Sequence, residues 1–192
     1  MDFEQSVSWQ QLEERLTRTT NPRHRLMLQT VIDHAKAESR GDVDGLMATL
    51  SDDPQYHFWN ATGQDWGPKG LTDVREFYEK FVVSGAGFFE SYKPRIVVDD
   101  DNVVTESVMR GIVPGAIARA RGCDVDDVNG HYFVTARTAI FWPFDEAGQL
   151  IGEDSYGVSD ATDCRRVADE QLPAEYVAML DAIGFSGVPA SR

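Results

Sequence analysis

The hydrophobic pattern of the chain changes from a helical period in its first half to an alternating period in its second half. The first long helical pattern starts at Pro22, with Asn21 as the predicted cap, and ends at Gly41, where a left-handed residue is needed. The face that this helix buries comprises Met27, Val31, His34, Ala35 and Glu38.

Two more helical patterns follow before residue 83. Asp42 is predicted to cap the short helix in GDVDGLMATL, and a third helix opens at Gly70 in GLTDVREFYEKFV. Between them, Pro54 starts a predicted strand that runs from 55 to 60. The apolar stripe of the third helix is Leu71, Val74, Phe77, Tyr78 and Phe81.

From about residue 87 the apolar residues alternate with polar ones, as in strands. The segments FFESYKPRIVV, VVTESVMRGIV, HYFVTARTAIFWPF and LIGEDSY are separated in part by the turns DDDN and DEAGQ, which predicts an antiparallel sheet. Residues 114–129 are longer than a hairpin loop, and a connection of this length is often a lid or a subunit contact.

Helical patterns also occur at both ends of the chain. Ser8 and Gln11 have the spacing of a capping box before an amphipathic helix, and PAEYVAMLDAI near the other end is a helix that Gly184 ends. We therefore expect an N-terminal helical extension over 1–20, a pocket domain over 21–160 and a helical tail over 161–192.

The net charge limits the partners. The 192 residues include 18 Lys and Arg against 32 Asp and Glu, a net charge of -14 that repels nucleic acid and anionic membranes. The single basic cluster, around Arg119 and Arg121, is followed at once by aspartates. No signal-peptide pattern and no run of about 18 apolar residues is seen, so a soluble, cytoplasmic protein is expected.

The cysteines and acidic loops give no sign of a metal or cofactor site. Cys123 and Cys164 lack CxxC spacing and companion histidines, so neither a zinc site nor a disulfide framework is indicated, and buried or incidental thiols are expected. The acidic string from Asp124 to Gly130 does not match the register of a calcium loop. We expect no cofactor and no metal.

The order of elements and three segments, GDVDGLMATLSDD, GLTDVREFYEKF and PFDEAGQL, resemble the ketosteroid isomerase and SnoaL-like proteins of the nuclear transport factor two fold. The resemblance covers roughly residues 24–158. It implies an α+β cone in which a curved antiparallel sheet and three helices enclose a pocket. Because this fold hosts isomerases, cyclases, dehydratases, hydrolases and carriers, the chemistry must come from the pocket residues.

The catalytic identities of ketosteroid isomerase are missing from this sequence. The resemblance places His34, Phe58 and Ile140 where that family has a tyrosine donor, an aspartate base and a protonated aspartate. Phe58 cannot move a proton and Ile140 cannot bind an oxyanion. Ketosteroid isomerisation by the family mechanism is therefore excluded.

Strand alternation combined with the resemblance predicts the remaining pocket walls. The expected substrate-binding residues are Tyr56, Phe58, Asn60, Tyr78, Tyr132, Thr138, Ile140 and Trp142. His34 and Glu153 are the predicted catalytic pair, because histidine titrates near neutral pH and burial raises the pKa of a carboxylate. The alternatives are a core role for His34 and a register in which Asp154 replaces Glu153. Glu106 fits either face of its strand and is a reserve candidate.

The opposite strand face is expected to form a homodimer interface, because aromatic and arginine residues gather there. These residues are His57, Trp59, His131 and Arg137. Epoxide hydrolases of this fold use Asp and Arg residues in their cavities. If the predicted inward and outward faces of the strands were exchanged, Arg137 and Asp154 would be the nearest equivalent here.

These observations favour a cofactor-independent SnoaL-like enzyme that isomerises, cyclises or dehydrates a hydrophobic polycyclic or polyketide-like molecule. Two alternatives remain open from the sequence. One is a non-catalytic binding or dimerisation module of the same fold. The other is the structural subunit of a ring-hydroxylating oxygenase.

Overall fold

The computed structural model describes residues 3–59, 63–159 and 164–185. Its helices are α1 (Val7–Arg18), α2 (Pro22–Ser39), α3 (Val43–Met47), α4 (Gly70–Val83), α5 (Gly115–Ala120) and α6 (Ala174–Ala182). Its strands are β1 (His57–Trp59), β2 (Phe89–Val98), β3 (Asn102–Pro114), β4 (His131–Pro143), β5 (Asp154–Ser159) and β6 (Arg165–Val167). The long connection over 114–129 thus contains α5, and Asn60 lies outside the described residues.

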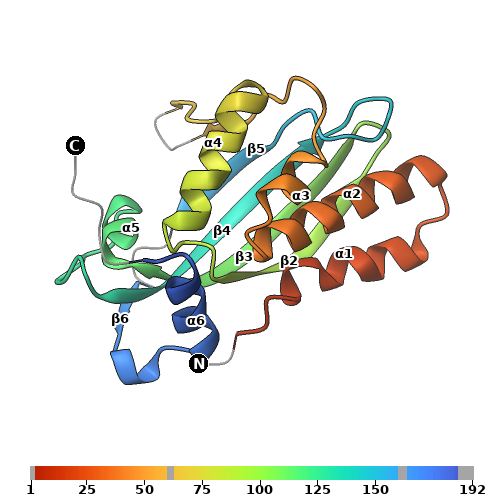
Figure 1. The fold of residues 1–192 in the computed structure, drawn as a ribbon. Coiled ribbons are helices and arrows are strands. Elements are labelled where there is room, and N and C mark those ends of the chain that lie inside the picture. Colours follow the sequence, from red (N-terminus) through yellow and green to blue (C-terminus); the bar gives the residue numbers. More distant parts are fainter. Residues whose placement is uncertain (1–2, 60–62, 160–163, 186–192) are drawn as a thin grey trace.

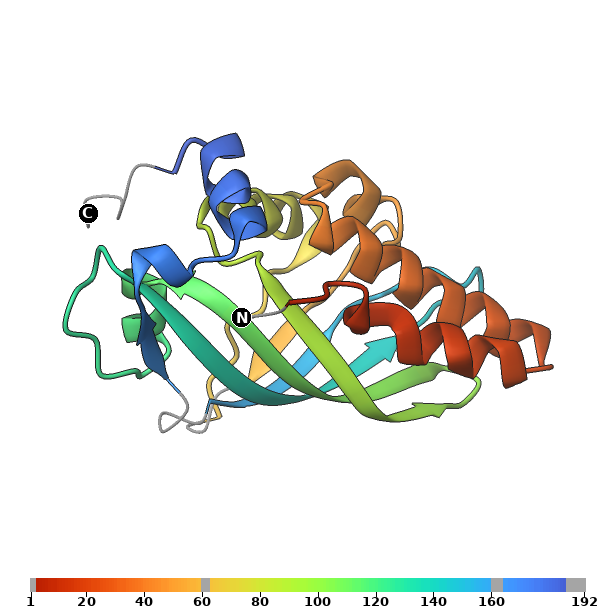
Figure 2. The same cartoon turned by 90° about the horizontal axis from the view of Figure 1, so that it is seen from below.

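One curved sheet is covered on its inner face by helices, so the predicted α+β cone is confirmed (Figure 1). The strand order is β1-β5-β4-β3-β2, and β6 pairs with β4 off this path. Helices α2, α3 and α4 lie over the sheet, and α1 lies beside α2 along β2 (Figures 1 and 2). The sheet is mixed, because β1 pairs with β5 in parallel while the other pairs are antiparallel.

Local sequence signals set the starts of the two helices that follow Asn21 and Asp42. The Asn21 side chain accepts a hydrogen bond from the Arg23 amide at 2.9 Å, and Asp42 accepts one from the Gly45 amide at 2.9 Å. Gly41, between these helices, has a φ of 64°, in the left-handed region that favours glycine. The caps predicted from the sequence are confirmed.

The predicted capping box of the N-terminal helix is wrong. Ser8 lies inside α1, and its hydroxyl accepts a hydrogen bond from the Ser91 amide at 3.0 Å. The Gln11 side chain likewise accepts one from the Lys93 amide at 3.2 Å. Both side chains are used to attach α1 to β2, because strand β2 has an edge with free amide groups.

The expectation of unpaired thiols is also wrong. Cys123 and Cys164 form a disulfide with a Cα–Cα distance of 5.9 Å across 41 residues of sequence. The bond joins the segment after α5 to the segment before β6, which the topology brings together and the cysteine spacing does not reveal. Disulfides are rare in the reducing cytoplasm, so the bond weighs against the expected cytoplasmic location, which stays a prediction.

None of the helices in the described ranges is long and apolar enough to cross a bilayer.

Candidate functional site

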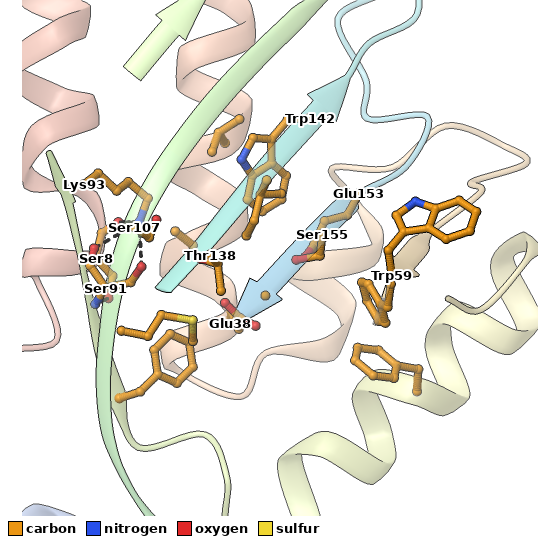
Figure 3. Close-up of a pocket in the computed structure, with 18 of the residues that line it drawn as sticks. Ser8, Glu38, Trp59, Ser91, Lys93, Ser107, Thr138, Trp142, Glu153 and Ser155 are labelled. Atoms are coloured by element: carbon orange, nitrogen blue, oxygen red, sulfur yellow. Dashed lines mark hydrogen bonds between the residues drawn. The ribbon is translucent and has the colours of Figure 1, made fainter. Parts of the chain in front are cut away.

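A cavity of about 540 Å³ lies between the inner face of the sheet and helices α2 and α4, with α1 at one side (Figure 3). Its lining residues are Ser8, Val31, Ala35, Glu38, Phe58, Trp59, Trp66, Phe77, Phe89, Ser91, Lys93, Ser107, Met109, Arg121, Thr138, Ile140, Trp142, Glu153, Ser155 and Gly157. A second cavity of about 270 Å³ shares Glu38, Phe89 and Arg121 with it. Eleven of these residues are apolar, four are charged and five carry a hydroxyl group, a mixture that suits a small-molecule site.

Helical spacing points Glu38 into this cavity. Val31, Ala35 and Glu38 lie on one face of α2, and all three line the cavity. The carboxylate of Glu38 makes no hydrogen bond with any other described residue. Burial raises the pKa of Glu38 to about 7, and the positive charge of Lys93 acts in the opposite direction.

Glu153 supplies a second carboxylate to the same cavity, just before β5 begins. Its backbone carbonyl accepts a hydrogen bond from the His57 amide at 2.7 Å, which fixes this segment beside β1. Burial and then the negative charge of Glu38 raise the pKa of Glu153 to about 8, while a hydrogen bond with Ser155 lowers it.

The two carboxylates titrate as a pair. Electrostatic repulsion is mutual, so ionisation of Glu38 or Glu153 makes ionisation of the other less favourable. Because both pKa values are raised well above 4.5, the pair holds a proton near neutral pH. One group is then available as a base and the other as an acid.

Lys93 supplies a buried positive charge at the opposite side of the cavity. The register of β2 on β3 shifts between Tyr92 and Arg95, and this β-bulge carries Lys93. Its ammonium donates to the Ser8 carbonyl at 2.5 Å, the Ser91 carbonyl at 3.2 Å and the Ser91 hydroxyl at 3.4 Å. Burial lowers the pKa of Lys93 to about 8, and the negative charge of Glu38 opposes this.

Figure 3 shows Lys93, Ser8, Ser91 and Ser107 together on one side of the cavity and Glu153 on the other, with Glu38 between them. The strand order agrees, because β2 and β5 lie on opposite sides of β3 and β4. Glu38 thus interacts with a positive charge and a negative charge within one apolar space.

His34 does not line the cavity, so the predicted direct contact with a ligand is not seen. It is only 1% exposed, and its ring packs edge-on against Trp142, which does line the cavity. Burial lowers the pKa of His34 to about 4, so the ring is neutral at pH 7. Its catalytic role stays a prediction that would have to act through neighbouring groups.

A directed chain of hydrogen bonds explains the tautomer of His34. The Thr49 hydroxyl donates to the Leu46 carbonyl at 2.7 Å, so it accepts from His34 Nδ1 at 2.8 Å. His34 Nε2 then accepts from the Tyr78 hydroxyl at 2.9 Å, and Tyr78 accepts from the Tyr56 hydroxyl at 3.1 Å. Tyr56 and Tyr78 are therefore buried hydrogen-bonding groups beside the cavity, and neither lines it.

The other predicted binding residues divide into two sets. The structure brings Phe58, Thr138, Ile140 and Trp142 together in the cavity wall. Tyr132 points the same way from β4 but belongs to a separate core cluster, where its hydroxyl donates to Asp126.

The predicted outer face needs two corrections. Trp59 stacks on His57 at 5.7 Å but borders the cavity, because β1 is a short strand at the edge of the sheet. His131 contacts α6 instead of facing outward, with its Nδ1 2.9 Å from the Tyr176 hydroxyl. Arg137 remains exposed on the outer face.

Glu106 also lies on the outer face, where it forms an ion pair with Arg95 at 3.4 Å. It is therefore not available to the cavity as a reserve acid or base.

Sequence reasoning missed Glu38, Lys93, Ser107 and Arg121 as cavity residues. Glu38 was detectable, since it is a carboxylate on the apolar stripe of the first long helix. Lys93 depends on a β-bulge and on the docking of α1, which no periodic pattern reveals.

Comparison with known proteins settles the family. The SnoaL-like domain matches residues 31–135, more than half of the chain. The chain belongs to the SnoaL-like domain family. This confirms the resemblance inferred from the sequence motifs.

Solved structures share the fold of this SnoaL-like protein at low identity. A protein of Jannaschia sp. CCS1 described as a SnoaL-like polyketide cyclase has 17% identity and a TM-score of 0.55, over 72% of this chain and 90% of that one. An epoxide hydrolase of Mycobacterium tuberculosis, described as LEH-like, has 19% identity and a TM-score of 0.51, over 74% and 88%.

RV0760c of Mycobacterium tuberculosis, in complex with estradiol-17beta-hemisuccinate, has 14% identity and a TM-score of 0.51, over 73% of this chain and 98% of that one. These similarities establish the fold alone. No curated protein matches the sequence.

Proposed function

We propose that this SnoaL-like protein is a cofactor-independent enzyme that isomerises, cyclises or dehydrates a hydrophobic polycyclic or polyketide-like molecule by proton transfer. The observation that carries the proposal is the pairing of Glu38 and Glu153 in one apolar cavity, with the pKa of each raised. Pairs of carboxylates that retain a proton near neutral pH are suited to general acid and base catalysis.

The two carboxylates take different roles in this account. The positive charge of Lys93 favours the ionised form of Glu38, so Glu38 acts as the base and accepts a proton from a carbon atom activated by a neighbouring carbonyl group. Burial and the negative charge of Glu38 favour the protonated form of Glu153, which donates its proton to another atom of the substrate. In an isomerisation the proton gained by Glu38 and the proton lost by Glu153 balance, and exchange between the carboxyls restores the resting pair.

The cavity walls support a ring-shaped, mainly apolar substrate. Phe58, Phe77 and Ile140 provide flat and aliphatic surfaces in the same cavity as the carboxylates. The volume of about 540 Å³ is in the range of small-molecule sites. The polyketide cyclase and the steroid complex among the similar folds are consistent with such a ligand.

Proton exchange on a simple ring ketone tests this proposal and does not require the natural substrate. The ketone 2-tetralone, incubated with the protein in D₂O, exchanges its α protons for deuterium at a rate that NMR measures. We expect the wild type to accelerate this exchange and Glu38→Gln and Glu153→Gln each to lower the acceleration by about 100-fold or more. Glu106→Gln, on the outer sheet face, is the matched control and should exchange like the wild type.

A carrier gives a different result. If 2-tetralone binds but its exchange rate is unaffected by the protein, the non-catalytic alternative is favoured. Mass spectrometry of small molecules that co-purify with the protein then identifies the natural ligand class.

We also propose that the outer sheet face pairs two copies of the chain. Exposed apolar side chains gather there, with Val97 51% exposed, Phe141 41% and Tyr156 48%. The rings of Phe141 and Tyr156 pack on each other at 5.9 Å, and charged side chains, among them Arg95, Glu106 and Arg137, lie on the same face. Exposed apolar side chains on the outer face of a sheet are suited to a symmetric partner.

A further inference from the structure

Two hydroxyl groups in the cavity wall have no hydrogen-bonding partner in the part of the chain that the structure describes. Ser107 Oγ and Thr138 Oγ1 are both buried, and neither has a partner among the described residues. Ser107 is only 1% exposed. Buried hydroxyls are normally satisfied, so two unsatisfied ones in the wall of one cavity are open to a partner that the described residues do not supply.

The sheet register places these hydroxyls next to each other. Ser107 of β3 and Thr138 of β4 are direct cross-strand partners, and both line the cavity. Thr138 in turn pairs with Gly157 of β5, which has no side chain to fill the space beyond it. The two residues therefore lie side by side in the cavity wall, over the centre of the sheet.

We propose that Ser107 and Thr138 together bind a carbonyl or hydroxyl oxygen carried by an apolar ring ligand. This proposal rests on the proposed function only in taking the cavity as the ligand site. Each hydroxyl can donate to a ketone oxygen, and each can also accept from an alcohol.

Lys93 makes the same position suited to an oxygen that gains negative charge. The β-bulge that carries Lys93 lies opposite Ser107 in the register of β2 and β3. Its ammonium is already bonded to Ser8 and Ser91, so it acts on a ligand oxygen through its charge and not as a direct donor. A substrate carbonyl that becomes an enolate would be stabilised there.

A nearby hydroxyl group on β3 does have a hydrogen-bonding partner. Thr105, two residues before Ser107 on β3, accepts a hydrogen bond from Trp142 Nε1 at 3.1 Å. Its hydroxyl therefore needs no ligand. This contrast provides a matched control on the same strand and the same sheet face.

Calorimetric binding of 2-tetralone and of tetralin, the same ring system without the oxygen, tests the proposal. We expect Ser107→Ala and Thr138→Val each to weaken 2-tetralone binding about fivefold, which corresponds to the loss of one hydrogen bond, and to leave tetralin binding unchanged. The control Thr105→Val should change the affinity for both probes by the same factor.

Several results would overturn the proposal. One is that Ser107→Ala and Thr138→Val lower the affinity for 2-tetralone and for tetralin by the same factor. Another is that these variants leave both affinities unchanged. A third is that the wild type does not bind 2-tetralone. The binding measurement and the deuterium-exchange assay on 2-tetralone test different residues. Unchanged exchange in Glu38→Gln and Glu153→Gln removes the catalytic roles of the carboxylates, whereas the ratio of ketone to hydrocarbon affinity reports on the hydroxyl pair.

Discussion

The ammonium of Lys93 donates a hydrogen bond to the backbone carbonyl of Ser8 at 2.5 Å, and this contact joins the N-terminal helix to the wall of the cavity. Both residues line the cavity, so the N-terminal helix is part of the site. A deletion of the first 20 residues would remove a section of the wall as well as a peripheral helix.

Substitution of Lys93 tests this contact. Lys93→Met removes the hydrogen bonds from the ammonium to the carbonyls of Ser8 and Ser91, and it removes the positive charge that lowers the pKa of Glu38. We expect the free energy of unfolding to fall by about 2 kcal/mol, measured with urea, and the pKa of Glu38 to rise, measured by NMR. An unchanged pKa of Glu38 would show that the two groups do not interact.

His34 predicts an acid-sensitive component of stability. Burial lowers the pKa of His34 from 6.5 to about 4, so the unfolded chain binds a proton that the folded protein does not between these pH values. The contribution of neutral His34 to the free energy of unfolding is fully present above pH 6.5 and is lost as the pH falls toward 4. Relative to His34→Gln, the wild type should lose on the order of 3 kcal/mol of unfolding free energy over that range. Parallel pH profiles for the two proteins would contradict this.

The outer sheet face predicts a dimer that one charge disrupts. Wild-type protein should show about twice the chain mass of 21.4 kDa in light scattering, and Phe141→Glu should reduce the mass to that of one chain. The matched control is Val177→Glu, an exposed apolar residue on α6, which should remain dimeric. A monomeric wild type at micromolar concentration would count against the interface.

The disulfide predicts a dependence of stability on oxidation. Cys123 and Cys164 close a loop of 41 residues, and the chain-entropy account gives a stabilisation of about 4 kcal/mol for a loop of this length. Reduction, or Cys123→Ser with Cys164→Ser, should lower the unfolding midpoint in urea. If oxidised and reduced proteins unfold alike, the bond does not form in solution.

The local parts of this fold are predictable from the sequence because their signals are local. Asn21 and Asp42 cap the helices that follow them, and the apolar stripe from Val74 to Tyr78 gives α4 its buried face. Strand alternation on β4 likewise points Thr138 into the cavity. The family resemblance supplied the arrangement of these elements.

Several features of the site and the disulfide could not be predicted, because they depend on contacts between segments far apart in the sequence. Alternation alone does not choose a face for Ser107, since both faces of β3 carry apolar and polar residues. Lys93 reaches the cavity through a bulge, and Cys123 meets Cys164 only after β4 and β6 pair. His34 fits the apolar stripe, but its hydrogen bonds to Thr49 and Tyr78 place it in the core.

The proposed function depends on the coupling of the Glu38 and Glu153 carboxyls in one cavity. The most direct test is a pH titration of the glutamate side-chain carboxyl carbons by ¹³C NMR, in the wild type and in Glu38→Gln. We expect both carboxyls to titrate well above 4.5 in the wild type, near 7 for Glu38 and near 8 for Glu153. In Glu38→Gln the pKa of Glu153 should fall, because a repelling negative charge is removed, yet stay above 4.5 because of burial. Ordinary pKa values near 4.5 for both residues, or a Glu153 titration that Glu38→Gln does not change, would show that the two carboxyls are not coupled in the cavity.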